Sequence, residues 1–398
     1  MKLIINEPHI KNNRLISNIK YGNKQYDMYF EVEKKYTKYL SNTSNAFLVA
    51  LLPFIIKHEY DVIVKGDISS KLYYQLNNYL IPLLCREFKK KKINIKCNLT
   101  NIKYESKGVG ASISCGVDSF YTLLKHKNIK DYSITHLTFF NAGSNGENGG
   151  EEARKLYYER LKPIKKFCEE QNYELVTVDT NMNELIQMDH EMTHTFRTLS
   201  CVFALEKLFG KYYFASGLNF NNSHIDEEDT AYYDILNVHC LSNENIDFYC
   251  SGLETTRMEK IKFISQFSET YNWLNVCIMK ENNCGHCNKC IRTMTALDSI
   301  NKLENYKNVF DIEEYKKNKT VILKNLIIGQ RDKTAKQFYG EIIESFKENN
   351  KKIPFKSYLL AYIPSKQNIK YVIKKIIPKS IMDKIKKPKI KENGWISK

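Results

Sequence analysis

The segment Ala111–Ser119, which reads Ala-Ser-Ile-Ser-Cys-Gly-Val-Asp-Ser, constrains the fold of this chain more than any other stretch. An apolar strand is predicted over 109–113, and a helix over 118–127 follows after a few small residues. Such a loop aims backbone N–H groups at one point beside the helix N-terminus. The unpaired N–H groups and the helix dipole both favour an anion, so the segment predicts a phosphate-binding loop.

Strands and helices alternate through residues 106–220. The strands are short and continuously apolar, as in a buried parallel sheet, and crossovers of this length are right-handed. We therefore expect a doubly wound α/β sheet whose ligand crevice lies at the carboxyl ends of the strands. The predicted strands are 109–113, 132–140, 174–179 and 211–216, and the predicted helices are 118–127, 151–171 and 194–209.

The hexapeptide Ser114–Ser119 resembles the Ser-Gly-Gly-x-Asp-Ser signature of the PP-loop ATP pyrophosphatases. The resemblance implies a PP-loop fold that cleaves ATP between its α and β phosphates and activates a substrate as the adenylate. It implies that Ser114, Gly116 and Ser119 hold the phosphates that leave as pyrophosphate. It also implies that Asp118 acts in catalysis with Ser119, by shaping the loop or by binding Mg²⁺ through water.

Cys115 stands where the signature has its first glycine, and Cys115 and Val117 complete the predicted nucleotide-binding loop. A thiol at a helix N-terminus can have a lowered pKa and act as a nucleophile. Alternatively, a small side chain simply fits where glycine usually sits. We favour the second interpretation, because phosphates crowding the loop leave little room for a reacting carbon.

Two further strand ends are predicted beside the nucleotide. The resemblance implies that the stretch around Phe139 flanks the adenine. After the fourth strand, Gly217 would permit close approach of the backbone to the nucleotide. The alternative for Gly217 is an ordinary turn at the end of a strand.

Four cysteines gather late in the chain, at Cys277, Cys284, Cys287 and Cys290. Four thiolates at this spacing suit tetrahedral Zn²⁺ in a closed, structural site. The ligand type alone leaves an iron–sulfur cluster open. A redox Cys-x-x-Cys is less suitable, because the motif does not open a thioredoxin-like unit.

The loop and the cysteine cluster together resemble the 7-cyano-7-deazaguanine synthase branch of the PP-loop enzymes, over residues 108–300. The resemblance implies a ligase-like reaction that uses ATP, Mg²⁺ and zinc. A carboxylate, amide or ureido oxygen of a small-molecule substrate would attack the α phosphate, and ammonia or an amine would then displace AMP. The stretch 217–255 does not resemble the standard substrate-binding segment of that branch.

Two charged segments are candidates for the same cleft. The acidic loop 223–229 could hold Mg²⁺ with its carboxylates, or could be an ordinary solvated loop. Arg257 and Lys260, in a helix predicted over 255–268, could act in catalysis by neutralising the triphosphate or a substrate carboxylate. The alternative for both basic residues is a plain surface helix.

A histidine-rich helix start gives a third candidate. His190, His194 and Arg197 precede and open the helix predicted over 194–209, and they could face the substrate. A capped helix start explains the same residues equally well.

The chain of 398 residues carries a formal net charge of +16, of which a large part lies in its last residues. Residues 366–398 hold eleven lysines and only two acidic residues. Nucleic acid, an anionic lipid or an acidic partner would suit this tail, although a lysine-rich overall composition explains it as well. No apolar run reaches the length of a membrane span and no leader segment is evident, so we expect a cytoplasmic protein.

We expect four parts along the chain. These are an N-terminal α+β module (1–105) for scaffolding or homodimer formation, the PP-loop domain with its metal site (106–300), a helical extension (301–363) and a basic tail (364–398). The module is predicted to hold strands at 1–6, 26–32, 60–65 and 93–99 and helices at 44–57 and 69–90.

Two other functions remain open. A sulfur-transfer enzyme acting on tRNA would use the same adenylation, with Cys115 or Cys201 carrying the sulfur. No RNA-binding module is recognisable, so nucleic acid is not the favoured partner. A non-catalytic, nucleotide-binding regulatory protein is the second alternative.

Overall fold

The computed structural model describes residues 2–277 and 279–362, so the predicted basic tail at 364–398 lies outside the described residues. The chain divides into two compact units, which are treated separately below. The first comprises Met1–Ser114 with Asp118–Thr256, and the second comprises Cys115–Val117 with Arg257–Lys398.

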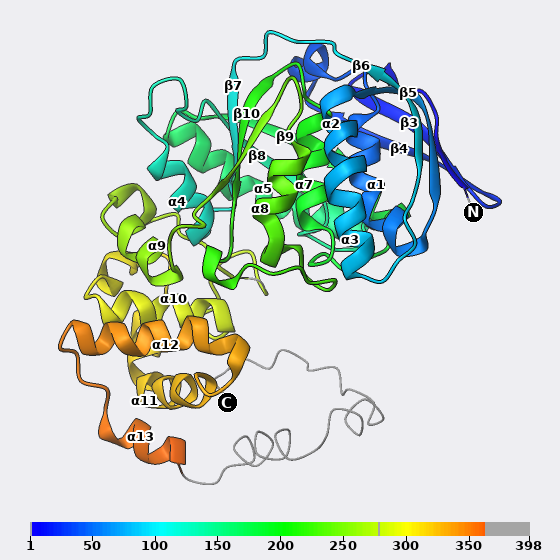
Figure 1. The fold of residues 1–398 in the computed structure, drawn as a ribbon. Coiled ribbons are helices and arrows are strands. Elements are labelled where there is room, and N and C mark those ends of the chain that lie inside the picture. The colour runs from blue at the N-terminus through cyan, green and yellow to red at the C-terminus, as the bar shows by residue number, and fades with distance from the viewer. Residues whose placement is uncertain (1, 278, 363–398) are drawn as a thin grey trace. The chain divides into compact units, whose positions relative to one another are not determined.

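The first unit is built on one eleven-stranded sheet (Figure 1). Its strand order is β11-β10-β7-β8-β9-β4-β3-β1-β5-β6, and β2 pairs with β3 beside this path. The strands are β1 (Lys2–Ile5), β2 (His9–Lys11), β3 (Arg14–Tyr21), β4 (Lys24–Val32), β5 (Asp61–Ser69), β6 (Ile95–Thr100), β7 (Gly108–Ser112), β8 (His136–Asn141), β9 (Glu174–Thr180), β10 (Phe209–Ala215) and β11 (Asp247–Ser251).

Strands β7 to β11 are mutually parallel where they pair and form the doubly wound part of the sheet. From β7 the chain moves outward through β8 to β9, then returns to the other side of β7 to form β10 and β11. Right-handed crossovers therefore put α4 and α5 on one face and α7 on the other. The helices of this part are α4 (Val117–Lys125), α5 (Gly150–Glu170), α6 (Met182–Ile186), α7 (His194–Phe203) and α8 (Asp234–Leu241).

The N-terminal residues extend the same sheet, because β4 pairs antiparallel with β9. The sheet is thus continuous across the boundary predicted at residue 105. On one face α1 packs against α7, and α7 against α8, as Figure 1 also shows. The helices of this part are α1 (Asn45–His58), α2 (Ser70–Gln75) and α3 (Ile81–Glu87).

A buried carboxylate fastens the N-terminal residues to the doubly wound part. Glu206 is fully buried and accepts hydrogen bonds from Ser41, Thr43, Asn45 and Asn243, at 2.6 to 2.8 Å. Burial raises the pKa of Glu206, while these four donors favour its charged form. Such a fully bonded carboxylate makes the junction specific.

The second unit is helical over its described residues. It holds α9 (Arg257–Ile264), α10 (Asn288–Ser299), α11 (Ile312–Gly329), α12 (Lys333–Glu348) and α13 (Phe355–Tyr362). The expectation of a mostly helical stretch after residue 300 agrees with α11 to α13. Within the described residues, none of the helices has the length and apolar character needed to cross a membrane.

The expected α/β class is confirmed: over residues 2–277 and 279–362, a large, mostly parallel sheet is combined with thirteen α-helices. Two elements of the N-terminal part differ from expectation. The helix predicted over 69–90 is three pieces, because a π-helical stretch at Leu76–Leu80 separates α2 from α3. The hairpin of β2 and β3 was not predicted.

Candidate functional site

The phosphate-binding loop predicted from the sequence links β7 to α4. The Ser119 hydroxyl lies 3.3 Å from both the backbone N–H and the hydroxyl of Ser114, so both ends of the loop are drawn together. Cys115 adopts φ of 56°, in the left-handed region that glycine prefers. The residue that departs from the family signature therefore keeps the backbone conformation that a glycine would adopt freely.

This loop follows β7, the strand at which the order of the parallel strands reverses. The next strand along the chain, β8, lies on one side of β7, whereas β10 lies on the other. The connection that leaves β7 and the one that enters β10 therefore cover opposite faces of the sheet, and β7 is the strand at which the order reverses. In open α/β sheets ligands bind at such a point.

Hydrogen bonds beneath the loop join the three strands that meet there. The hydroxyl of Tyr212, on β10, lies 2.8 Å from the Ser112 hydroxyl on β7 and 2.7 Å from the Thr138 hydroxyl on β8. Tyr212 is fully buried, and burial raises the pKa of its hydroxyl. A neutral phenol therefore joins the three strands next to this loop.

Phe139 and Gly217, the two residues predicted to flank the nucleotide, lie on or just after the strands on either side of β7. Phe139, on β8, is buried, and its ring stacks on Tyr157 of α5 with centroids 5.3 Å apart. Gly217 follows the end of β10, and a Cβ atom there would meet nothing within 4 Å. Its place at a strand end agrees with the prediction, whereas the need for glycine is not apparent from packing.

On the face opposite α4, the start of α7 and the acidic loop come together. His194 Nε2 lies 3.6 Å from Asp229 Oδ1, and the His194 ring is nearly parallel to that of Phe214 on β10. The adjacent Thr195 hydroxyl donates to Asp234, which is fully buried at the start of α8. Two candidates that the sequence suggested separately thus form one acid–base cluster near the carboxyl end of β10.

The cluster has perturbed proton affinities. Burial alone would lower the pKa of His194, but its bond to Asp229 and the charges of Asp234 and Glu191 raise it. Burial raises the pKa of Asp234 to about 6, against the opposing effects of His194 and Thr195. Groups that change protonation near neutral pH are suited to moving protons.

Arg197 anchors this region to the loop after β8. Its guanidinium is fully buried and donates to the backbone carbonyls of Glu147 and Met188. Gly143 has φ of 111°, and a Cβ atom there would lie 2.4 Å from Arg197 Nη1 and 2.8 Å from His190 Nδ1. Arg197 is therefore a structural side chain, in contrast to the substrate contact that we considered for it.

Several carboxylates of the acidic loop 223–229 already have partners within the protein. Asp229 accepts the N–H of Ala231, Asp226 accepts that of Glu228, and Glu227 lies 3.6 Å from Lys90. These partners favour the ordinary-loop interpretation over a Mg²⁺ site. The loop instead supplies Asp229 to His194.

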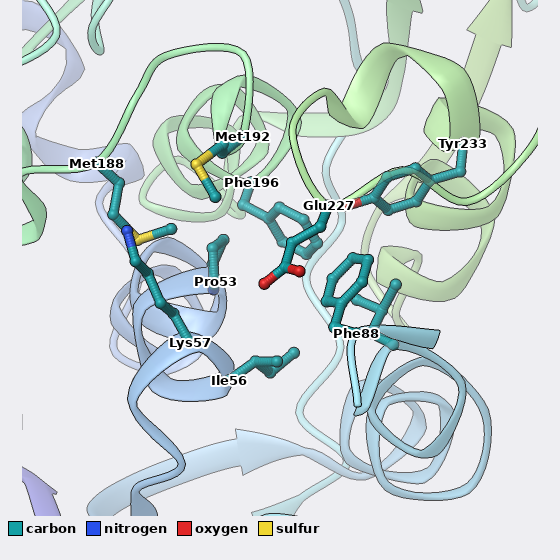
Figure 2. A pocket seen from close by; sticks show the side chains of 10 residues that line it. Pro53, Ile56, Lys57, Phe88, Met188, Met192, Phe196, Glu227 and Tyr233 are labelled. Carbon is teal, nitrogen blue, oxygen red and sulfur yellow. The ribbon is translucent and has the colours of Figure 1, made fainter. Parts of the chain in front are cut away.

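A small apolar cavity lies on the other side of the same loop (Figure 2). Met188, Met192 and Phe196 face Pro53 and Ile56 across it, and the Glu227 carboxylate points between the rings. Its volume of about 30 Å³ admits about two water molecules and excludes a nucleotide.

A larger hollow of about 420 Å³ lies beside the C-terminal end of α4. Its walls include Tyr132, Tyr213 and Tyr249, and His126 stacks on Tyr213 at 3.9 Å. Burial lowers the pKa of His126 to about 4, so this ring is neutral at pH 7. The sequence did not indicate this hollow, because its aromatic residues are spread over 120 positions with no motif among them.

In the second unit, the four predicted cysteine ligands converge. Their sulfur atoms all lie within 4.8 Å of one another, and Cys287 and Cys290 are buried. Backbone N–H groups donate to three of the sulfurs: Lys280 to Cys277, Cys287 to Cys284, and Cys290 to Cys287, at 3.3 to 3.5 Å. Across residues 2–277 and 279–362, this is the one group of three or more such side chains close enough to hold a metal.

The donor set fits zinc. Tetrahedral Zn–S bonds of about 2.3 Å place sulfur atoms about 3.8 Å apart, within the observed spread. A hydrogen bond with the Cys287 sulfur and burial both raise the pKa of the Cys290 thiol. A bound divalent cation would lower that pKa and favour the thiolate. The cluster could therefore hold a metal such as zinc, and zinc would tie the turn around Gly285 to the start of α10.

Three other residues singled out from the sequence lie on α9 and α7. Arg257 and Lys260 are on α9 of the second unit, where Lys260 is buried. Cys201 is fully buried within α7, and burial raises its pKa. A thiol of that kind is inert, so Cys201 is unsuited to carry sulfur.

Comparison of the chain with protein-family models, with curated proteins and with solved structures finds no match.

Proposed function

We propose that this protein is an ATP-dependent, ligase-like enzyme that cleaves ATP to AMP and pyrophosphate. The position of the loop Ser114–Ser119 carries the proposal. It follows β7, where the strand order reverses, and it opens α4. The proposal is supported because a sequence typical of phosphate binding follows the strand at which ligands commonly bind in such sheets.

In the proposed reaction a carboxylate, amide or ureido oxygen of a small molecule attacks the α phosphate of MgATP. The bond from that phosphate to the bridging oxygen breaks, and pyrophosphate leaves towards the N–H groups and hydroxyls of the loop. Ammonia or an amine then attacks the activated carbon, and AMP departs. Asp118 would orient the loop or a hydrated Mg²⁺ ion, and Arg257 and Lys260 stay candidates for charge neutralisation.

The cluster of His194, Asp229 and Asp234 supports the second half of this reaction. An attacking amine must lose a proton, and a histidine paired with a carboxylate can accept one. The cluster lies near the carboxyl end of β10, the strand next to β7. Its location therefore suits a proton acceptor for chemistry in the crevice.

The four-cysteine site has a structural part in this proposal. A closed tetrahedral site leaves no open position for a substrate. We infer that zinc stabilises the turn before α10 and takes no part in the reaction.

The proposal is tested by pyrophosphate release from MgATP with a panel of carboxylates, each with and without ammonium. We expect release with at least one substrate, AMP as the other product, and a loss of about 100-fold or more in Asp118→Asn and Ser119→Ala. Asp131→Asn and Ser133→Ala, in the connection after α4, are matched controls that should keep full activity.

Three outcomes would count against the proposal. ADP and phosphate as products would indicate γ-phosphate chemistry. Full activity in Asp118→Asn and Ser119→Ala would place the reaction elsewhere. Tight ATP binding without pyrophosphate release from any substrate would favour the alternative of a regulatory nucleotide-binding protein.

A further inference from the structure

The hollow beside the C-terminal end of α4 is lined by aromatic side chains, and all its lining residues belong to the first unit. Its volume of about 420 Å³ is within the range of pockets that hold small organic molecules. Four of its nine lining residues carry rings, namely His126, Tyr132, Tyr213 and Tyr249. The proposed reaction makes no use of this hollow.

Three tyrosine rings form a corner at the edge of the sheet. Tyr213 and Tyr249 are paired in register across the parallel strands β10 and β11, and their ring centroids lie 5.6 Å apart. Tyr132, in the connection after α4, meets Tyr249 at an angle of 69°, with centroids 6.0 Å apart. β11 stands at one end of the strand order, and Tyr132 is 39% exposed. The corner is therefore accessible from solvent.

One uncharged polar pair lines the hollow beside these rings. His126 Nε2 lies 3.2 Å from the Ser251 hydroxyl, and the imidazole stacks on Tyr213 at 3.9 Å. Burial lowers the pKa of His126 to about 4, so the ring is neutral at pH 7. A neutral imidazole and a hydroxyl can both form hydrogen bonds with an uncharged ligand. Neither group supplies a charge that would balance an ion.

Charges of both signs flank the hollow. Glu254 and Lys125, at its wall, form an ion pair with each other. Lys211 and Asp247 occupy paired positions of β10 and β11, on the same face of the sheet as the two strand tyrosines. A ligand of either charge would therefore meet a like charge beside the rings, which is unfavourable. A neutral ligand avoids this repulsion.

We propose that this hollow binds a neutral, planar heteroaromatic molecule, up to the size of a nucleoside. Its ring would contact the corner of tyrosine rings, where offset-stacked and edge-to-face contacts are both favourable. The polar edge of the same ring would face His126 and Ser251. An aliphatic ligand suits the site less, because Ile129 is the one aliphatic side chain among the described lining residues.

The hollow and the phosphate-binding loop lie at opposite ends of α4. Ser119 is in the first turn of this helix and Lys125 is its last residue, about 9 Å further along the helix axis. The heteroaromatic ligand would thus be a second molecule, bound in addition to ATP. Its binding should therefore survive a substitution in the loop.

Titration of the full chain with nicotinamide and with cytidine, followed by NMR, tests the proposal. We expect saturable binding of both probes, with a Kd of about 1 mM or tighter. The ring resonances of His126 should shift, because His126 lines the hollow. Cyclohexanecarboxamide carries the same amide as nicotinamide on an aliphatic ring, and it should bind at least about fivefold more weakly. The organic cation choline should also bind at least about fivefold more weakly.

Variants of Tyr249 separate the ring from its hydroxyl. Tyr249→Ala should weaken nicotinamide binding at least about fivefold, whereas Tyr249→Phe keeps the ring and should bind as the wild type does. Tyr74→Ala, at an exposed tyrosine of α2, is the matched control and should also bind as the wild type does, as should Ser119→Ala. Circular dichroism and thermal melting verify that each variant is folded.

Four outcomes would overturn the proposal. The first is that the wild type binds neither ring probe, and the second is that cyclohexanecarboxamide or choline binds as tightly as nicotinamide. The third is equal weakening by Tyr249→Ala and Tyr74→Ala. The fourth is loss of nicotinamide binding in Ser119→Ala, which would place the ligand at the loop instead.

Discussion

The hydroxyl of Tyr212 lies 2.8 Å from that of Ser112, so a part-buried hydrogen bond joins β10 to β7 next to the loop Ser114–Ser119. The same hydroxyl reaches Thr138 on β8. One phenol therefore spans the strands on both sides of the point where strand order reverses. A phenylalanine at this position would leave the fully buried Thr138 hydroxyl and the half-buried Ser112 hydroxyl without that partner.

Tyr212→Phe should consequently destabilise the protein by about 1–2 kcal/mol, because the fully buried Thr138 hydroxyl loses its partner without gaining water. Urea denaturation followed by circular dichroism measures this difference. Tyr249→Phe, on the edge strand β11, is the matched control and should cost less. Equal losses in the two variants would show that the bond beneath the loop is unimportant.

Cys115 should tolerate glycine better than a branched residue. Its φ of 56° is strained for a side chain, by about 1 kcal/mol, and more for a β-branched one. Cys115→Gly should therefore stay within about 1 kcal/mol of the wild type and keep pyrophosphate release, whereas Cys115→Val should lose stability. Loss of activity in a stable Cys115→Gly protein would instead identify the thiol as a nucleophile.

The purified protein should contain about one zinc ion per chain, as four thiolates at this spacing require. Cys284→Ser should lose the metal and melt at a lower temperature, since the site links the Cys277 turn to α10. Cys97→Ser, on β6 of the first unit, should retain the metal. Elemental analysis distinguishes the outcomes, and iron with acid-labile sulfide would contradict the assignment.

The His194–Asp229 pair should make stability depend on pH. The folded pKa of His194 is raised, so its contribution is complete below the unfolded value of about 6.5 and is lost as pH rises through the folded pKa. His194→Gln should therefore destabilise the protein more at pH 6 than at pH 9. Unfolding at both pH values measures this.

His239→Gln is the control for that experiment, because His239 is exposed on α8. NMR titration gives a second readout: the pKa of His194 should fall in Asp229→Asn. A stability loss that is equal at both pH values would show that the pair has only a packing role.

Most of the doubly wound part could be predicted because its strands are buried on both faces and read as continuous apolar runs. β3 was missed although Leu15, Ser17 and Ile19 are buried in strict alternation. Ser17 interrupts the expected alternation of apolar and polar residues, because it is polar and yet buried. Its hydroxyl donates a hydrogen bond to the Asn6 carbonyl. β11 is only five residues long, begins with Asp247 and ends with Ser251, so it has little strand signal of its own.

The candidate site was predictable where its residues are contiguous. The loop and the cysteine cluster are local motifs, and the backbone brings their members together at short range. The pairing of His194 with Asp229 could not be predicted, because it joins residues 35 positions apart through the return of β10 beside β7. The role of Arg197 depends on Gly143 and Glu147, in a loop with no sequence signal for that contact.

The central claim is that the loop Ser114–Ser119 binds ATP, and calorimetric titration of the full chain with MgATP tests it without knowledge of the substrate. We predict saturable binding with one nucleotide per chain, weakened at least about tenfold in Ser119→Ala, which is the loss of about 1.4 kcal/mol expected for one phosphate contact. The Ser133→Ala control should bind as the wild type does. Absence of ATP binding, or equal affinity in Ser119→Ala and the wild type, would contradict the account.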